Sequence, residues 1–228
     1  MSNAWTLTVT APAADLQLLS EEELRAAAGL EPDDTSQDAS LATLGVQAST
    51  ALANACGLAK AGYDASLAPL RGEAPPTFKA ETLSQRFHVW SGYDSSKLLL
   101  ARWPVLEIIS VTVGDTELVV DDWMVDIPGA ALVRVSGLGT LAWPCGRAVV
   151  EYDAGFDIVP EDLKGYAVRM VGLYSHTGVG GADPSERRVE IPGVITVERW
   201  VDTATTDVIV PEDILTGLAR DGYRRVLA

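Results

Sequence analysis

The run YDAGFDIVPEDLKGYAVRMVGLYSH, from Tyr152 to His176, constrains the fold more than any other part of the sequence. It starts like the end of a strand and turns into a helical pattern after Pro160, because proline suits the first helical position, where its missing N–H would have no partner. The apolar residues that follow cover much of the helix circumference, which is typical of a helix at the centre of a core. We therefore predict a central helix that directly follows a strand.

Two glycines in this predicted helix, Gly165 and Gly172, lie two turns apart and would let another backbone approach closely. We expect the packing of the core helix to depend on five residues: Leu163, Gly165, Met170, Gly172 and Tyr174.

The phrase VPED recurs at Pro211, where it predicts the start of a second, shorter helix with fewer apolar residues. This segment closes with a basic, tyrosine-bearing group: Arg220, Tyr223, Arg224 and Arg225. Cations near a helix C-terminus are favourable for the helix dipole, and this explanation is purely structural. The alternative is that these residues bind an acidic partner. Both interpretations stay open at this point.

Between Phe78 and Tyr152 the apolar period becomes two, and Gly, Asp and Pro separate short strands, with VGDTEL as a tight-turn candidate. Before this region, Ser20 and Glu23 have capping-box spacing, and Gly29 is a plausible helix stop. The order of helices, strands and helices predicts an α+β fold: a small helical core with an inserted antiparallel β-meander and a short C-terminal docking helix. We expect three segments, an N-terminal arm with helices (1–77), the β insertion (78–152) and a C-terminal part (153–228) that folds with the first.

The formal net charge of −15 makes tight DNA binding unfavourable, since such a surface repels phosphate. No stretch is long and apolar enough to cross a membrane, and the N-terminus lacks signal-peptide features, so we expect a soluble protein made in a cytosol. The cysteines, Cys56 and Cys145, are expected to be two buried, unpaired thiols. The histidines, His88 and His176, have no partner at metal-ligand spacing, and both are expected to play structural roles.

The sequence contains no recognisable catalytic, metal-binding or cofactor-binding motif. HTGVGGAD is glycine-rich but does not follow a strand and open a helix, so it predicts a loop and not a phosphate site. A glycosidase-like carboxylate pair would need a cleft, and nothing in the sequence selects its two residues. The function classes that these residues leave open are a structural protein, a generic β-rich binding module and, last, a polysaccharide hydrolase.

In their order, several short motifs resemble the head–tail connector, or adaptor, family of tailed bacteriophages, including the adaptors of gene transfer agents. The matching residues are Pro104, Val105, Ile108, Ser110, Val111, Tyr152, Ala154, Gly155, Val159, Pro160, Asp162, Leu163 and Lys164. GYRRV at the C-terminal end is similar to the ending of many members. LYSHTG departs from the family's usual helix ending, and the N-terminal arm and FKAETLSQRFHVW are longer than in the family.

The resemblance implies a protein without enzymatic activity or cofactor that sits in the neck of a virion and is assembled in the bacterial host cytoplasm. It implies a homo-oligomeric ring (dodecameric in that family) on the portal protein, with a neck, stopper or tail protein as the next partner. DNA would pass through the channel of the ring without specific binding. The resemblance also assigns portal docking to Arg220, Tyr223, Arg224 and Arg225.

Overall fold

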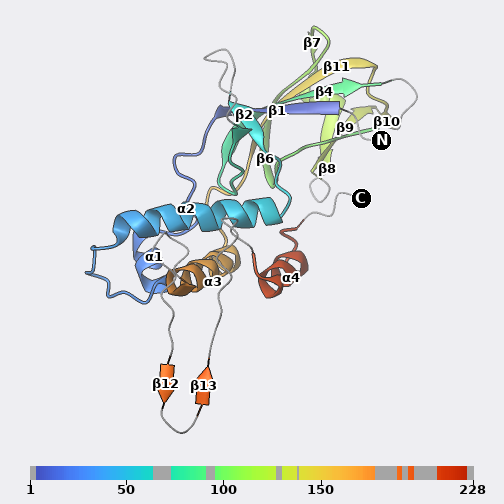
Figure 1. Cartoon of the computed structure of the whole chain (residues 1–228). Coiled ribbons are helices and arrows are strands. Elements are labelled where there is room, and N and C mark those ends of the chain that lie inside the picture. Colours follow the sequence, from blue (N-terminus) through green and yellow to red (C-terminus); the bar gives the residue numbers. More distant parts are fainter. Residues whose placement is uncertain are drawn as a thin grey trace.

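The computed structural model describes residues 4–63, 73–90, 96–126, 130–137, 139–177, 189–191, 195–197 and 210–224 (Figure 1). Its helices are α1 (Glu21–Ala27), α2 (Asp38–Ala55), η1 (Val120–Asp122), α3 (Glu161–Thr177) and α4 (Glu212–Arg220). Its strands are β1 (Ala4–Ala11), β2 (Ala61–Tyr63), β3 (Glu73–Ala74), β4 (Glu81–Val89), β5 (Lys97–Leu99), β6 (Val105–Val113), β7 (Thr116–Glu117), β8 (Trp123–Asp126), β9 (Ala131–Ser136), β10 (Gly139–Leu141), β11 (Gly146–Ala154), β12 (Val189–Ile191) and β13 (Ile195–Val197). The α+β class is confirmed.

The largest sheet has seven strands in the order β3-β2-β1-β4-β11-β6-β7, and all neighbouring pairs except β1–β2 are antiparallel. Burial alternates along β4, as expected for a sheet with one covered face. From β4 to β7, the sheet order is β4-β11-β6-β7, because β11 returns to lie between β4 and β6. In this part of the sheet, only β6 and β7 are neighbours both in the sheet and along the chain. Gly114, at the first central position of the β6–β7 turn, has φ +61°, so VGDTEL forms the predicted hairpin.

A smaller sheet of β5, β8, β9 and β10 packs on the apolar face of the large one. Leu98 and Leu132 of the small sheet and Phe87 of the large sheet belong to the same buried cluster, together with Trp143. The β strands therefore have a core of their own. Figure 1 shows that α1 to α4 gather at the opposite end of the molecule from this core.

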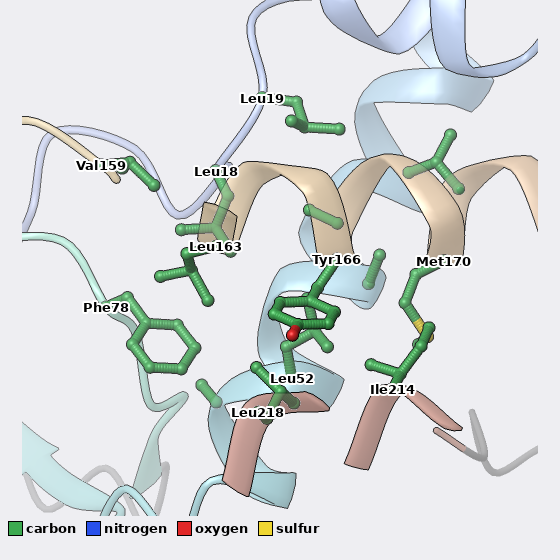
Figure 2. Close-up of a cluster of buried hydrophobic side chains, with 14 of the residues drawn as sticks. Leu18, Leu19, Leu52, Phe78, Val159, Leu163, Tyr166, Met170, Ile214 and Leu218 are labelled. Atoms are coloured by element: carbon green, nitrogen blue, oxygen red, sulfur yellow. The ribbon is translucent and has the colours of Figure 1, made fainter. Parts of the chain in front are cut away.

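The helices α1 to α4 share a second buried cluster, shown in Figure 2. The Ser20 hydroxyl accepts the Glu23 N–H at 3.2 Å while the Glu23 carboxylate accepts the Ser20 N–H at 2.7 Å, which confirms the capping box. Gly29 ends α1 with φ +73°, also as predicted. The helices α3 and α4 each begin one residue after proline, at Glu161 and Glu212, because the proline carbonyl accepts the first helical hydrogen bond.

Gly155 joins the two cores. Its φ is +118°, and a Cβ on it would lie 2.3 Å from the carbonyl oxygen of Lys79, a distance that no real Cβ tolerates. The backbone at this point is tied on both sides, because the Gly155 N–H donates to the Pro104 carbonyl and the Phe156 N–H donates to the Phe78 carbonyl, at 2.8 and 2.7 Å. Only glycine can adopt this conformation this close to another backbone.

A buried charge pair lies beside this junction. Arg102 is 2% exposed and Glu81 is 6% exposed, and their closest charged atoms are 3.7 Å apart. Burial raises the pKa of Glu81 and lowers the pKa of Arg102, although each partner opposes the shift of the other. One guanidinium nitrogen of Arg102 donates to the carbonyl of Thr77 at 3.2 Å, and Nε and Nη2 have no hydrogen-bond acceptor among the described residues. The pair therefore links β4 to the segment before β6 at a high desolvation cost.

The cysteines differ from the expectation in one respect. Both are free thiols, and Cys56 is buried, but Cys145 is exposed because it lies in the turn before β11. Burial raises the pKa of Cys56 to about 12, so this thiol stays protonated.

Replacing Gly155 with alanine is expected to cost about 3 kcal/mol of unfolding free energy, because the new methyl group meets backbone that cannot move. The matched control is Gly165→Ala in α3, where a Cβ meets nothing within 4 Å and should stabilise the helix by about 0.5–1 kcal/mol. Urea unfolding of both variants measures the difference. Equal effects at the two positions would contradict the role of Gly155.

For the buried pair, Glu81→Leu and Arg102→Met are each expected to destabilise by roughly 3–5 kcal/mol, since each leaves an uncompensated buried charge. The double variant should lose much less than the sum of the two, because it removes both charges. Thermal and urea unfolding of the wild type, the two single variants and the double variant give the double-mutant cycle. Additive losses would mean that the two charges do not interact.

Candidate functional site

The helix α4 is the element that the sequence singled out for partner binding, and its apolar side faces the inside of the molecule. Ile214 and Leu218 are fully buried and point toward Tyr166 and Met170 of α3 (Figure 2). Gly217 makes this approach possible, because a Cβ there would lie 2.4 Å from the Tyr166 hydroxyl. The buried side of α4 is therefore built to fit α3 of the same chain.

Hydrogen bonds and an ion pair along the α3–α4 contact add to this packing. The Tyr166 hydroxyl donates to Asp221 at 2.5 Å, and Arg169 pairs with Asp213. The Asp221 carboxyl accepts from both Arg220 and Tyr166, which lowers its pKa. A further hydrogen bond joins the segment after α4 to α3: the Tyr223 hydroxyl donates to the Asp162 carboxylate at 2.7 Å.

Tyr223 is placed by the way α4 ends. Gly222 takes φ +82°, the Gly222 N–H donates to Ala219, and the Tyr223 N–H donates to Leu218, which is a Schellman ending. This turn directs the Tyr223 ring into the core, where it is only 8% exposed.

Three aromatic rings surround Tyr223. Its centroid lies 6.4 Å from Phe78, 6.3 Å from Trp103 and 6.3 Å from Phe156. Burial, followed by the hydrogen bond to Asp162, raises the pKa of Tyr223. The structure thus places Tyr223 in the core of its own chain, in contrast to its expected position on a docking surface.

The basic residues of the predicted docking group are placed differently. Arg220 has a side chain that is 75% exposed and pairs with Asp221 at 2.9 Å, and Arg224 is exposed. Arg225 lies outside the described residues. Two guanidinium groups therefore stand at the surface beside a tyrosine that anchors the helix end.

The five residues expected in core-helix packing also separate into two groups. Leu163 and Met170 are fully buried, and Tyr174 is 9% exposed. A Cβ on Gly172 would lie 3.3 Å from the carbonyl oxygen of Ala27, so α3 passes close to the end of α1 there. Gly165 is exposed and has open space around it, so no described backbone of this chain approaches it.

The described residues contain no group of three or more His, Cys, Asp or Glu side chains that could hold a metal ion. In the same residues, no helix has the length and apolar character needed to cross a bilayer.

One group of side chains escaped the sequence-based search. Arg86 and His88 alternate with the buried residues of β4, so the period-two pattern of this strand was the signal that could have placed them on its outer face. Arg147 of β11 pairs with His88 across the sheet, and this neighbour was not predictable because β4 and β11 are far apart in sequence. His88, expected in a structural role, is exposed and lies beside Trp90, with ring centroids 6.4 Å apart.

No protein-family model matches the sequence, and no curated protein resembles it significantly. Several solved structures are similar to this chain. A chain in the neck of an empty gene transfer agent (GTA) particle, computed with C6 symmetry, superposes on it with a TM-score of 0.56 at 16% identity, covering 98% of this chain and 97% of that one. The chain shares its fold with a GTA neck chain. A chain of the virion of a native GTA particle superposes with a TM-score of 0.57 at 15% identity, over 97% and 96% of the two chains. The head–tail connector resemblance is confirmed at the level of the fold.

Tyr223→Phe removes only the hydroxyl that donates to Asp162 and is expected to cost about 1 kcal/mol, whereas Tyr223→Ala should cost about 3–5 kcal/mol by emptying an aromatic pocket. Arg224→Ala is the control, because this side chain is exposed, and it should change stability by less than about 0.5 kcal/mol. Thermal unfolding measures all three. A neutral Tyr223→Ala would contradict the core position of this ring.

Proposed function

We propose that this chain is a head–tail connector, or adaptor, of a tailed phage or GTA particle. In this role it forms a ring on the portal protein, extends the DNA channel and presents a surface for the next neck, stopper or tail protein. The observation that carries the proposal is the likeness to GTA neck and virion chains over nearly the whole length of both chains. The ordered connector motifs in the sequence support it independently, since Gly155 and Pro160 sit at the junction on which the fold depends.

The role is structural and not enzymatic. Such a role needs rigid surfaces and no reacting group. The residues singled out in α3 and at the end of α4 fit it, because they pack in the core or lie at the surface. The net charge of −15 suits a channel component, because excess carboxylates repel phosphate and let DNA pass without binding.

In this role α4 has two sides with separate tasks. Its inner side and Tyr223 fasten it to α3, while the exposed guanidinium groups of Arg220 and Arg224 contact acidic residues of the portal. Tyr223 therefore contributes to docking as an anchor that fixes the positions of its neighbours.

Cryo-electron microscopy of the parent particle tests the function. We expect density with this fold between the portal and the tail, in a closed ring. Density elsewhere in the particle, or absence from the particle, would overturn the proposal.

The portal contact has its own test. Arg220→Glu combined with Arg224→Glu is expected to weaken binding to the purified portal protein at least about tenfold, since it turns attraction into repulsion. The matched control adds the same change in net charge on the exposed side of α2 by replacing Ser40, Thr43, Gln47 and Asn54 with glutamate (the α2 control). Biolayer interferometry against immobilised portal measures both. Equal loss in both variants would assign the effect to net charge alone.

A further inference from the structure

The outer face of the large sheet carries two arginines that have no ion-pair partner among the described residues. Arg86, His88 and Arg147 are all exposed, and the pairing of β4 with β11 sets Arg147 opposite His88 and diagonal to Arg86. Side chains in such positions are about 5–8 Å apart. We call these three residues, with the exposed Trp90 beside His88, the basic face.

The protein has 32 acidic residues against 17 lysines and arginines, and many of its described cations have a carboxylate partner. Arg25, Lys97 and Arg169, for example, each lie within 4.0 Å of a carboxylate. Within the described residues, neither Arg86 nor Arg147 forms such a pair, although they are close neighbours of like charge. The other diagonal neighbour of Arg86, Glu151, accepts a hydrogen bond from the Ser110 hydroxyl and forms no ion pair with Arg86. Like charges side by side are unfavourable in the free chain and favour an anionic partner.

A complementary surface lies on the edge strand β7 and on η1, which follows it in the chain. Glu117 of β7 and Asp121 of η1 are exposed, Asp122 is partly exposed, and none of the three forms an ion pair within the described residues. Between them, Val119 and Val120 are 64% and 72% exposed. We call these five residues the acidic edge.

Glu117 of the acidic edge cannot neutralise Arg86 of its own molecule. Glu117 pairs with Thr112, Thr112 with Val149, and Val149 with Arg86, so three strand spacings separate Glu117 from Arg86. At about 4.8 Å per spacing this is roughly 14 Å, which is beyond an ion pair. Figure 1 shows the β7 hairpin projecting from the top of the sheet, where another molecule can reach it.

We propose that the acidic edge of one copy binds the basic face of the next, so that a second copy of this chain is the partner of both surfaces. This inference rests on the proposed function, because a closed ring of identical copies needs two different surfaces that fit each other. Carboxylates meet the two arginines, and the exposed valines meet Trp90. A DNA backbone would supply anions but no apolar side chains, and the net charge of −15 repels it.

A charge exchange tests the contact. The first variant combines Arg86→Glu with Arg147→Glu, and the second combines Glu117→Arg, Asp121→Arg and Asp122→Arg. Each variant alone sets like charges against like charges, whereas a mixture of the two restores opposite charges at every contact. Because Arg86, Arg147, Glu117 and Asp121 are exposed and Asp122 is partly exposed, both variants should melt close to the wild type.

Sedimentation velocity at low ionic strength is the measurement. We expect the wild type and the α2 control to assemble as concentration rises, each variant alone to associate at least about tenfold more weakly, and the equimolar mixture to assemble again. Assembly should weaken at about 1 M salt, where the Debye length is about 3 Å.

A wild type that stays monomeric at every concentration, or variants that assemble as the wild type does, would overturn the proposal. A mobility-shift assay with double-stranded DNA gives the competing outcome: if the first variant loses DNA binding and keeps assembly, the basic face is a DNA contact. The connector function and this contact can fail separately. If the chain lies in the neck of the particle but both charge variants assemble normally, only the contact is refuted.

Discussion

The contact between Gly155 and the backbone of Lys79 holds the molecule together as one unit. At this point β11 leaves the sheet and turns toward α3, and the neighbouring backbone passes so close that a side chain has no room. Hydrogen bonds from Gly155 and Phe156 fasten the turn to segments on both sides. The sheet core and the helical core are two clusters that both contact Trp103, so their relative position depends on this residue, on this short piece of backbone and on the charge pair beside it.

Where the chemistry is local, the sequence predicted the structure well. The capping box at Ser20, the turn at Gly114 and the two helix starts after proline each depend on a few consecutive residues. The strand order was not predictable, because the return of β11 between β4 and β6 is decided by packing between distant segments. The burial of Tyr223 was not predictable for a related reason: the basic residues around it indicated a surface, while the turn at Gly222 directs its ring inward. For Arg102 a signal existed, a lone arginine inside the apolar run LLLARW, but sequence alone does not identify its partner Glu81.

In the proposed role, the described surface assigns the contacts of a connector to different parts of the fold. The helical end carries the exposed arginines at and after the end of α4, and the sheet end carries the basic face and the acidic edge. Axial contacts to a portal and lateral contacts between copies would then use separate elements. A change in one set of contacts need not disturb the other, because the two cores share few residues, with Trp103 packed against both.

The return of α4 to the helices has a consequence for the order of folding during synthesis. Residues from Leu18 to Leu58 and residues from Ile214 to Tyr223 belong to the same cluster, whereas the strands of the large sheet are complete by Ala154. Contacts between such distant segments form slowly, because a long loop must close first. On the ribosome the sheet can fold while the helical end waits for its last member, so α1 to α3 expose apolar surface until the final helix emerges.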